Sequence, residues 1–384
     1  MVVDPVSRLK KNRRFMIRVK EIDLYITNKC NLRCPFCSVE VNKEMDCELT
    51  LNEIKTFIGS AKEMGLEELH LTGGEPLLRK DVCEIVKYAV DKQLNVRLIT
   101  NGTLMTLSLF DELYNAGLRS IMFSLDGLLK YNDSIRSRGS FSKTIRAIKI
   151  CLEKSDMIIR ANSVAWVDNM QDIKELLLVL NELKIDTYSV FLGSPLGHGR
   201  GYMDKVINPL TWQSFIDELK DIVRCNGIKT NVVIEKGFLF KEETDFDITS
   251  LSGRGVGCFS ISSNYDYFLV RANGHVYPCV FYSNSKNSIG NIRNNTLKAI
   301  LMQYKQNSFY NDVGKIPAEC LDCSNAKSCR GGCRGYAQLY TGKWTNKDIR
   351  CSDMQSDFVP LCPIMKYNLN TGKLGGSSEE ALKL

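Results

Sequence analysis

Residues 21–37 read EIDLYITNKCNLRCPFC, and this stretch decides how the rest of the chain is interpreted. An apolar run typical of a buried strand, residues 21–27, leads directly into a loop that carries Cys30, Cys34 and Cys37. Cysteine thiolates are the usual ligands of iron–sulfur clusters. Three of them in one short loop can hold three irons of a [4Fe–4S] cluster and leave the fourth iron open, whereas zinc would require a fourth ligand nearby. The spacing C-x3-C-x2-C therefore predicts an iron–sulfur site after the first strand.

Strand-like and helix-like segments alternate on the C-terminal side of this loop. Strands spaced by helices indicate parallel βαβ units, which fit a partial barrel or an open doubly wound sheet. In barrels of this kind the chemistry lies at the C-terminal ends of the strands. The expected strands are 21–27, 67–72, 95–100, 119–125, 157–167 and 186–192, and the expected helices are 51–64, 81–92, 106–116, 140–154 and 171–183, with a further helix at 211–225 and a strand at 230–235.

The composition restricts the function classes. The chain of 384 residues contains 15 cysteines and only 3 histidines, and its formal charge is +7. Neither a run of about 18 apolar residues nor a secretory signal is present, so we expect a cytoplasmic protein that does not enter the membrane. Disulfides are disfavoured in that compartment, which leaves metal ligation as the better explanation for the cysteines. The basic residues among 1–20 are interpreted as a solvated arm rather than an anion-binding one, and no nucleic-acid binding is inferred.

A glycine pair ends the second expected strand. Residues 67–72 run into Gly73, Gly74, Glu75 and Pro76. Two glycines at a strand end let the backbone approach a ligand closely. The sequence Gly-Gly-Glu-Pro is common in ordinary turns, and only its place one βα unit after the cysteine loop favours a binding role.

A third motif follows the fourth expected strand. Residues 124–136 read SLDGLLKYNDSIR and contain Ser124 and Arg136. A guanidinium forms a strong, directional pair with a carboxylate. Arg136 is thus a candidate anion ligand, with a surface cation as the alternative.

The C-terminal third of the chain is rich in Cys, Gly, Asn and Ser. We expect this segment to have little apolar core and to require metal for folding. A zinc ribbon is the structural alternative, because C-x2-C pairs also bind zinc. The cysteine spacing of this C-terminal segment is C-x15-G-x4-C followed by C-x2-C-x5-C-x3-C-x17-C, formed by Cys258, Cys279, Cys320, Cys323, Cys329, Cys333 and Cys351.

The first cysteine motif, with Phe36 before its third cysteine, resembles the defining motif of the radical S-adenosylmethionine (SAM) superfamily. The resemblance implies a partial (β/α)6 barrel in which the open iron chelates SAM and an electron from the cluster produces a 5′-deoxyadenosyl radical. An external reductant such as flavodoxin or ferredoxin is also implied. The implied SAM contacts are Phe36, the GGEP turn (Gly73, Gly74, Glu75 and Pro76) for the amino group, and Ser124 and Arg136 for the carboxylate.

The C-terminal spacing resembles the SPASM domain, which is attached to radical SAM enzymes that mature peptides and proteins. The resemblance implies two auxiliary clusters, and hence three [4Fe–4S] clusters in the chain. One would be held by Cys320, Cys323, Cys329 and Cys351, and the other by Cys258, Cys279 and Cys333, whose fourth ligand stays open with Cys362 as a candidate. The expected organisation is a basic arm (1–20), the radical SAM core (21–228), a bridging segment (229–257), the SPASM domain (258–365) and a disordered tail (366–384).

The substrate is the least determined property. Sulfatase maturases of this family carry an aspartate base immediately after the second SPASM cysteine, whereas this chain has Val280, which cannot take a proton. We therefore expect modification of a peptide by a thioether or carbon–carbon crosslink, or a similar oxidation. About 20 residues precede the first strand, too few for a leader-recognition domain, so a peptide would need a separate recognition protein or none. A small molecule such as a tetrapyrrole or a sugar-derived acid is the alternative. A noncatalytic iron–sulfur carrier or zinc-binding protein is the third class.

Overall fold

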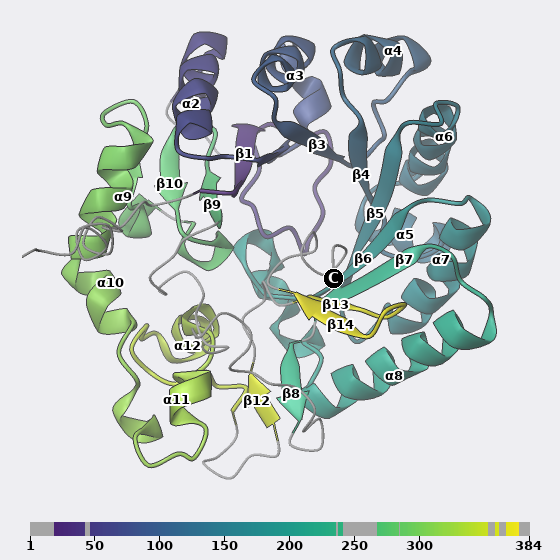
Figure 1. The fold of residues 1–384 in the computed structure, drawn as a ribbon. Coiled ribbons are helices and arrows are strands. Elements are labelled where there is room, and N and C mark those ends of the chain that lie inside the picture. Colours follow the sequence, from purple (N-terminus) through teal and green to yellow (C-terminus); the bar gives the residue numbers. More distant parts are fainter. Residues whose placement is uncertain are drawn as a thin grey trace, which may run out of the picture.

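Alternating apolar residues and central hydrophobic runs produce a curved sheet covered by helices (Figure 1). The computed structural model describes residues 19–42, 47–235, 237–240, 267–283, 285–351, 358–360 and 366–375. Residues 1–18 of the predicted arm, Cys258 and Cys362 lie outside the described residues.

Seven strands run parallel in the order of the chain, from β1 to β7. These are β1 (Glu21–Thr27), β2 (Glu68–Gly73), β3 (Asn95–Thr100), β4 (Ser120–Ser124), β5 (Ile158–Ala165), β6 (Thr187–Leu192) and β7 (Asn231–Glu235). Between them lie the helices α2 (Leu51–Glu63), α3 (Val82–Asp91), α4 (Leu107–Asn115), α5 (Leu129–Ile135), α6 (Ser140–Leu152), α7 (Met170–Glu182) and α8 (Pro209–Cys225), with short turns η1 (Pro76–Leu78) and η2 (Gly197–Lys205). The predicted barrel core is confirmed, and β7 adds a seventh parallel strand to it.

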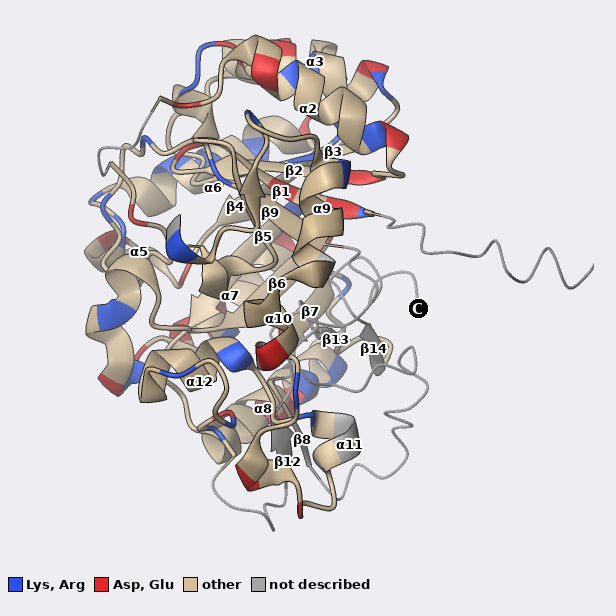
Figure 2. Ribbon diagram, turned by 90° about the vertical axis from the view of Figure 1, so that its left-hand side faces the viewer, with Lys and Arg blue, Asp and Glu red and all other residues tan. Residues whose placement is uncertain are grey.

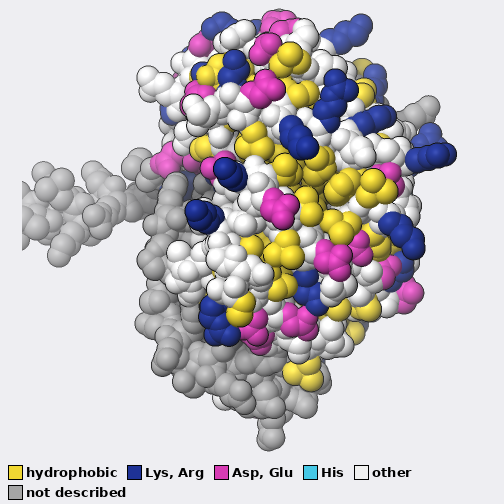
Figure 3. Space-filling model, turned by 90° about the vertical axis from the view of Figure 1, so that its right-hand side faces the viewer, with side chains coloured by type: hydrophobic (Ala, Val, Ile, Leu, Met, Phe, Trp, Pro, Cys, Tyr) yellow, Lys and Arg dark blue, Asp and Glu magenta, His cyan; other side chains and the backbone are white. Residues whose placement is uncertain are grey.

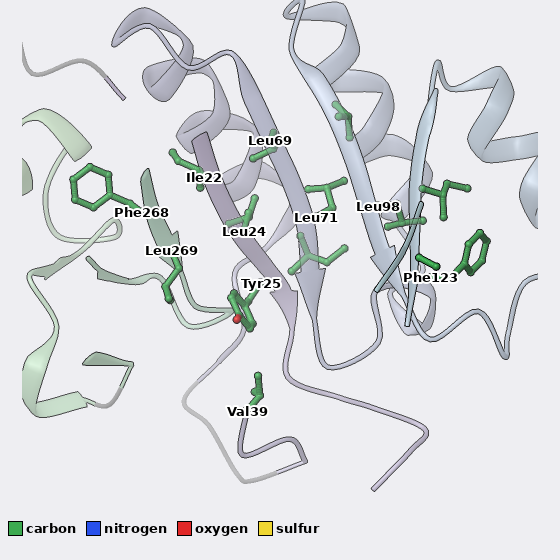
Figure 4. Packing of buried hydrophobic residues seen from close by; sticks show 14 of the residues in the cluster. Ile22, Leu24, Tyr25, Val39, Leu69, Leu71, Leu98, Phe123, Phe268 and Leu269 are labelled. Carbon is green, nitrogen blue, oxygen red and sulfur yellow. The ribbon is translucent and has the colours of Figure 1, made fainter. Parts of the chain in front are cut away.

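Large aliphatic side chains of neighbouring strands fill the space between the sheet and its helices. Figure 4 shows Ile22 and Leu24 of β1 beside Leu69 and Leu71 of β2, with Leu98 of β3 next along the sheet. All five are fully buried. Their burial is the main force that fixes the register of the strands, because a slip of one residue would turn these side chains to the opposite face.

The C-terminal domain extends the same sheet. Strand β9 (Tyr267–Val270) pairs with β1 in parallel, which aligns Ile22 with Phe268. Asp23 reinforces the junction, since its carboxylate lies 2.8 Å from Nδ1 of His70 and accepts a 2.7 Å hydrogen bond from the Tyr267 hydroxyl. The remaining described elements are β8 (Phe238–Phe240), β10 (His275–Tyr277), η4 (Val280–Tyr282), η5 (Ser285–Asn287), β11 (Gly290–Asn291), α9 (Leu297–Gln306), α10 (Ser308–Val313), η6 (Ala318–Cys320), α11 (Ala326–Cys329), α12 (Arg334–Thr341) and β12 (Phe358–Pro360).

The expectation of little apolar core in this domain was wrong. Its aromatic side chains pack together and join the core of the barrel. The rings of Tyr282 and Trp344 stack with centroids 4.2 Å apart, and those of Phe281 and Tyr336 lie 5.1 Å apart. The sequence pattern conceals this core because its aromatic residues come from separate short segments, which leave no helical or strand period.

The expectation of a disordered tail was also wrong for residues 366–375. They form a hairpin of β13 (Lys366–Asn368) and β14 (Lys373–Gly375), and β13 pairs antiparallel with β7. The side chain of Asn370 accepts a hydrogen bond from the Val232 amide at 2.8 Å. Pairing of the exposed β7 edge compensates for the polar, glycine-containing sequence of the hairpin.

Charged residues lie mainly on the helices and loops around the sheet (Figure 2). On the face drawn in Figure 3, both signs of charge are distributed among hydrophobic side chains. Among the described residues, no helix is long and apolar enough to cross a bilayer.

Candidate functional site

The cysteine loop leaves the C-terminal end of β1, at the edge of the sheet where the other parallel strands also end. Burial raises the pKa of the Cys34 thiol to about 11, an effect that the guanidinium of Arg136 opposes and the nearby Cys37 and Cys30 reinforce. Burial likewise raises the pKa of Cys30 and of Cys37, and the same arginine acts against it. The three thiols therefore share one partly buried pocket, where burial favours the protonated form without metal and the Arg136 cation partly offsets the charge of the thiolates that a metal would bind.

Neighbouring loops fix the backbone of this cysteine loop. Asn42 accepts a 2.9 Å hydrogen bond from the amide of Cys30 and donates one of 3.0 Å to its carbonyl. On the other side, the amide of Gly199 donates to the Cys37 carbonyl at 3.2 Å. The approach there is so close that a Cβ on Gly197 would lie 2.5 Å from the Ser38 carbonyl oxygen.

The loop at 193–202 contributes the short helix η2, whose glycines contact the cysteine loop, while the side chains of His198 and Arg200 are exposed.

The GGEP turn contacts the beginning of the cysteine loop. The amide of Gly74 donates to the Thr27 carbonyl, and that of Glu75 to the Lys29 carbonyl, each at 2.8 Å. Gly73 has a φ of 146°, and a Cβ there would lie 2.2 Å from the Thr27 oxygen. The glycines are thus required for the close approach of two backbone segments.

Substitution of Gly74 should displace the cysteine loop. An alanine Cβ would lie 2.2 Å from the Lys29 carbonyl oxygen, so backbone must move, at a cost of about 1–3 kcal/mol. We expect Gly74→Ala to reconstitute with less iron and to melt at a lower temperature, measured by iron analysis and thermal unfolding. Gly201→Ala is the matched control, because its Cβ would meet nothing within 4 Å. Unchanged iron in Gly74→Ala would contradict this interpretation.

Glu75 is fully buried beneath this turn. Its carboxylate accepts hydrogen bonds from the Thr100 hydroxyl at 2.7 Å, the Asn101 amide at 2.8 Å and the Leu77 amide at 3.0 Å. Burial raises its pKa, although these donors favour the charged form. Glu75 therefore joins the ends of β2 and β3, and Pro76, which is buried, begins η1.

Ser124 and Arg136 lie on the same rim. The Ser124 hydroxyl donates to the Asn162 side chain at 3.3 Å. Arg136 donates from Nε and pairs through Nη2 with Asp126, at 2.6 and 2.5 Å. Asp126 is fully buried and also accepts a 2.8 Å bond from the Val164 amide. Asp126, within the SLDG motif, and Asn162, on β5, were not assigned from the sequence.

An aromatic wall closes this side of the pocket. The ring centroids of Phe36 and Tyr202 lie 6.2 Å apart, those of Trp166 and Tyr202 lie 5.1 Å apart, and the Cys34 side chain packs against this cluster. The guanidinium carbon of Arg136 lies 5.5 Å from the centre of the Phe36 ring. Trp166 is fully buried, and within the described chain its indole Nε1 has no hydrogen-bond partner. Its distance from the cysteines in the sequence concealed its place in the site.

Two further cysteine groups lie in the C-terminal domain. Cys320 and Cys329 end the short helices η6 and α11. Burial raises the pKa of both thiols, and the nearby Cys351 contributes to the rise in each. Cys323 lies one turn after Cys320, with its amide donating to the Cys320 carbonyl at 3.1 Å. Burial, to which the charge of Asp348 adds, raises the pKa of Cys329 to about 12.

The other group contains Cys279 and Cys333, which immediately precede η4 and α12. Phe281 of η4 packs against Tyr336 of α12, so these two helices lie together. Cys258, the third cysteine predicted for this group, lies outside the described residues.

The donor set fits iron–sulfur clusters better than zinc. Four thiolates around one zinc at about 2.3 Å would place their sulfurs about 3.8 Å apart. Among the described residues, no three cysteine sulfurs lie within 4.8 Å of one another, and the one group of ligand atoms that does is Glu21, Asp23 and His70 at the opposite end of the strands. The described cysteines therefore lack the close arrangement of a four-thiolate zinc site, whereas thiolates spread around a larger group are the usual ligands of an iron–sulfur cluster.

Comparisons with known proteins agree with this reading. Residues 24–180 match the Radical SAM superfamily, and residues 258–324 match SPASM, described as an iron–sulfur cluster-binding domain. The chain is 27% identical to an AdoMet-dependent heme synthase of Methanosarcina barkeri over 85% of this chain and 94% of that protein. It is 26% identical to a PqqA peptide cyclase of Bradyrhizobium diazoefficiens over 86% and 85%.

A solved structure supports the fold over most of the chain. Streptococcus suis SuiB bound to its precursor peptide SuiA has a TM-score of 0.73 at 20% identity, and the match covers 90% of this chain and 79% of that one. The two matched domains together span more than half of the sequence and contain the first cysteine motif and the start of the second. The chain therefore belongs to the radical SAM superfamily, as an enzyme with a C-terminal SPASM domain that binds SAM and iron–sulfur clusters.

Proposed function

We propose that this enzyme reductively cleaves SAM and uses the resulting 5′-deoxyadenosyl radical to abstract a hydrogen atom from its substrate. The observation that carries the proposal is the meeting of the cysteine loop, the GGEP turn and the Asp126–Arg136 pair at one edge of the sheet. A [4Fe–4S] cluster bound by Cys30, Cys34 and Cys37 would supply one electron to the sulfonium of SAM. We propose three such clusters in the chain, the other two in the C-terminal domain, because its cysteine spacing resembles that of the SPASM domain.

The residues around the cluster would bind and orient SAM. Arg136 and Ser124 are proposed to hold its carboxylate, since a guanidinium already fixed by Asp126 can add a charge-assisted hydrogen bond with little loss of side-chain entropy. The turn at Gly73 and Gly74 is proposed to lie against the amino group. The buried wall of Phe36, Trp166 and Tyr202 would exclude water from the site, which strengthens these electrostatic contacts.

A peptide is the substrate that we propose first. The similarity to the PqqA peptide cyclase supports this class. Val280, directly after Cys279, begins η4 and offers no base, which is consistent with a reaction other than sulfatase maturation. A flavodoxin or ferredoxin is proposed to reduce the cluster that binds SAM.

A small molecule is the second candidate, because one specific observation favours it. The relative described as a heme synthase is matched over 94% of its own length. A tetrapyrrole acid is therefore the alternative substrate class.

The proposal is tested by anaerobic incubation with SAM and dithionite. We expect 5′-deoxyadenosine to form slowly without substrate and faster with the correct one. Precursor peptides encoded near the gene and a set of iron-bound and metal-free tetrapyrroles are then compared for this stimulation. Absence of 5′-deoxyadenosine from a protein that carries its full iron content would overturn the proposal.

Loss of the Arg136 guanidinium should weaken SAM binding. A charge-assisted hydrogen bond contributes about 1.5–3 kcal/mol, which corresponds to roughly a 10- to 100-fold rise in KM for SAM. Arg136→Gln also leaves Asp126 buried without its cation, so that variant should unfold more easily.

The double variant Arg136→Gln/Asp126→Asn separates these two effects. It removes both charges and should recover thermal stability while keeping the high KM. A KM that recovers together with stability would assign Arg136 a purely structural role.

A further inference from the structure

Arg293, from the C-terminal domain, contacts the chain just after the cysteine loop. Its Nε donates to Glu53 Oε1 at 2.6 Å and its Nη2 to Oε2 at 3.3 Å, in a bidentate pair with α2. The same guanidinium donates to the carbonyl of Cys47 from Nη1 and to that of Glu48 from Nη2, both at 2.9 Å. One side chain therefore holds both the first turn of α2 and the segment 47–48 that precedes it.

Glu48 continues this connection to the beginning of the cysteine loop. Its carboxylate accepts hydrogen bonds from the Thr27 hydroxyl at 2.9 Å and from the Asn28 amide at 2.7 Å. Thr27 is the last residue of β1, and its hydroxyl accepts from the Lys29 amide at 3.1 Å. The chain of contacts thus runs from Arg293, through Glu48, to the residue before Cys30.

The segment 47–50 is fixed from two further directions. The amide of Leu49 donates to the Ala272 carbonyl of the C-terminal domain at 2.6 Å. From the barrel, Arg79 donates to the carbonyls of Leu49 at 2.8 Å and Ile26 at 2.7 Å. Because the backbone is held on both sides, Glu48 has one well-defined position from which to hold Thr27 and Asn28.

We infer that Arg293 is a positioning residue for the SAM-binding cluster, through which the docked C-terminal domain sets the geometry of the cysteine loop. The inference rests on the proposed function only in that SAM must bind at this loop. A lysine could not replace it, because a single ammonium group lacks the planar fork that reaches a carboxylate and two carbonyls at once. The Glu53 carboxylate keeps its charge across the working range, since the hydrogen bond from Arg293 lowers its pKa to about 2.

Simple adhesion between domains is the alternative role. The parallel pairing of β1 with β9 and the Tyr267–Asp23 hydrogen bond hold the domains together independently of Arg293. An Arg293→Gln variant should therefore remain folded with its C-terminal domain docked. This makes loop geometry measurable separately from stability.

The experiment compares Arg293→Gln, Arg293→Lys, Glu48→Ala and the double variant Arg293→Gln/Glu48→Ala with the parent enzyme. The control is Arg224→Gln, which breaks an exposed Arg224–Asp221 pair of 2.9 Å on α8. Each protein is reduced anaerobically, and its electron paramagnetic resonance spectrum is recorded with and without SAM. Iron content, melting temperature, and KM and kcat for 5′-deoxyadenosine formation are measured on the same preparations.

We expect the Arg293 and Glu48 variants to keep their iron but to show a diminished SAM-dependent change in the spectrum. A displacement of the reacting groups by about 1 Å can cost up to about 100-fold in rate, so we expect kcat to fall by at least about tenfold. Because both residues act through one chain of contacts, the double variant should be no worse than the poorer single variant.

Two results would overturn the inference. One is a normal SAM-dependent spectrum and normal kcat in Arg293→Gln, whatever its melting temperature. The other is strictly additive effects of Arg293→Gln and Glu48→Ala. Failure of the proposed function would be seen separately, as an absence of 5′-deoxyadenosine from the parent enzyme.

Discussion

The variant Cys30→Ala/Cys34→Ala/Cys37→Ala should release no 5′-deoxyadenosine and yet keep about two-thirds of its iron. The three thiols lie together in the loop after β1, and the described auxiliary cysteines lie in separate elements of the C-terminal domain. With about four irons per cluster and three clusters, we expect a fall from about 12 to about 8 irons per chain. Anaerobic iron and sulfide analysis, together with chromatographic detection of the nucleoside, measures both quantities.

The control for this variant is Cys151→Ala. Cys151 is a fully buried cysteine on α6, and burial alone raises its pKa to about 12, as expected for a thiol that packs in the core. Its loss should leave iron and nucleoside formation unchanged. Nucleoside release at the parent rate by the triple variant would falsify the assignment of the SAM-binding cluster to this loop.

Arg334→Lys should destabilise the auxiliary-cluster domain severely. Arg334 is 1% exposed, and within the described part of the chain its hydrogen bonds all go to backbone carbonyls. The acceptors belong to Val313, Gly331, Asn346, Lys315 and Arg330, at 2.7 to 3.3 Å. Hydrogen bonds to a charged group contribute about 1.5–3 kcal/mol each, and an ammonium cannot satisfy carbonyls on several sides, so we expect a loss of about 3 kcal/mol or more.

The consequence for the clusters follows from where these carbonyls lie. The segments that Arg334 joins flank Cys329, Cys333 and Cys351 in the chain, so loosening them should release auxiliary iron while the cluster after β1 is retained. Iron per chain and thermal unfolding test this.

Arg330→Lys is the matched control, because exposed Arg330 donates to a single described carbonyl, that of Gly314, at 2.9 Å. The prediction would be wrong if Arg334→Lys kept full iron and melted like the Arg330 variant.

Local patterns made much of the fold predictable. The expected strands 21–27 and 95–100 agree with β1 and β3 at both ends. The expected helix 51–64 begins where Thr50 and Glu53 form a capping box, a signal contained within four residues. Helix α5, within 129–135, was not predicted because it is short and its apolar residues do not repeat at a helical period.

Contacts between distant residues could not be predicted. Nothing in the sequence connects Arg293 with Glu53, which are 240 positions apart, or Asn162 with Ser124, which are 38 apart. The hairpin at 366–375 has weak strand character of its own and forms because β7 offers an unpaired edge. Each of these features depends on the register of the sheet.

By itself, the sequence determined the chemistry of the ligands, because Cys30, Cys34 and Cys37 lie within eight residues and no folding is needed to bring them near one another. It also determined the parallel βα order, through hydrophobic runs that must be buried. Only the tertiary structure decided that Asp126 fixes Arg136, that Trp166 packs with Phe36 and Tyr202, and that the C-terminal domain contacts the segment after the cysteine loop through Arg293. The physical reason is that hydrogen bonds and ring contacts act over a few ångströms in space, and their partners are chosen by strand register rather than by distance along the chain.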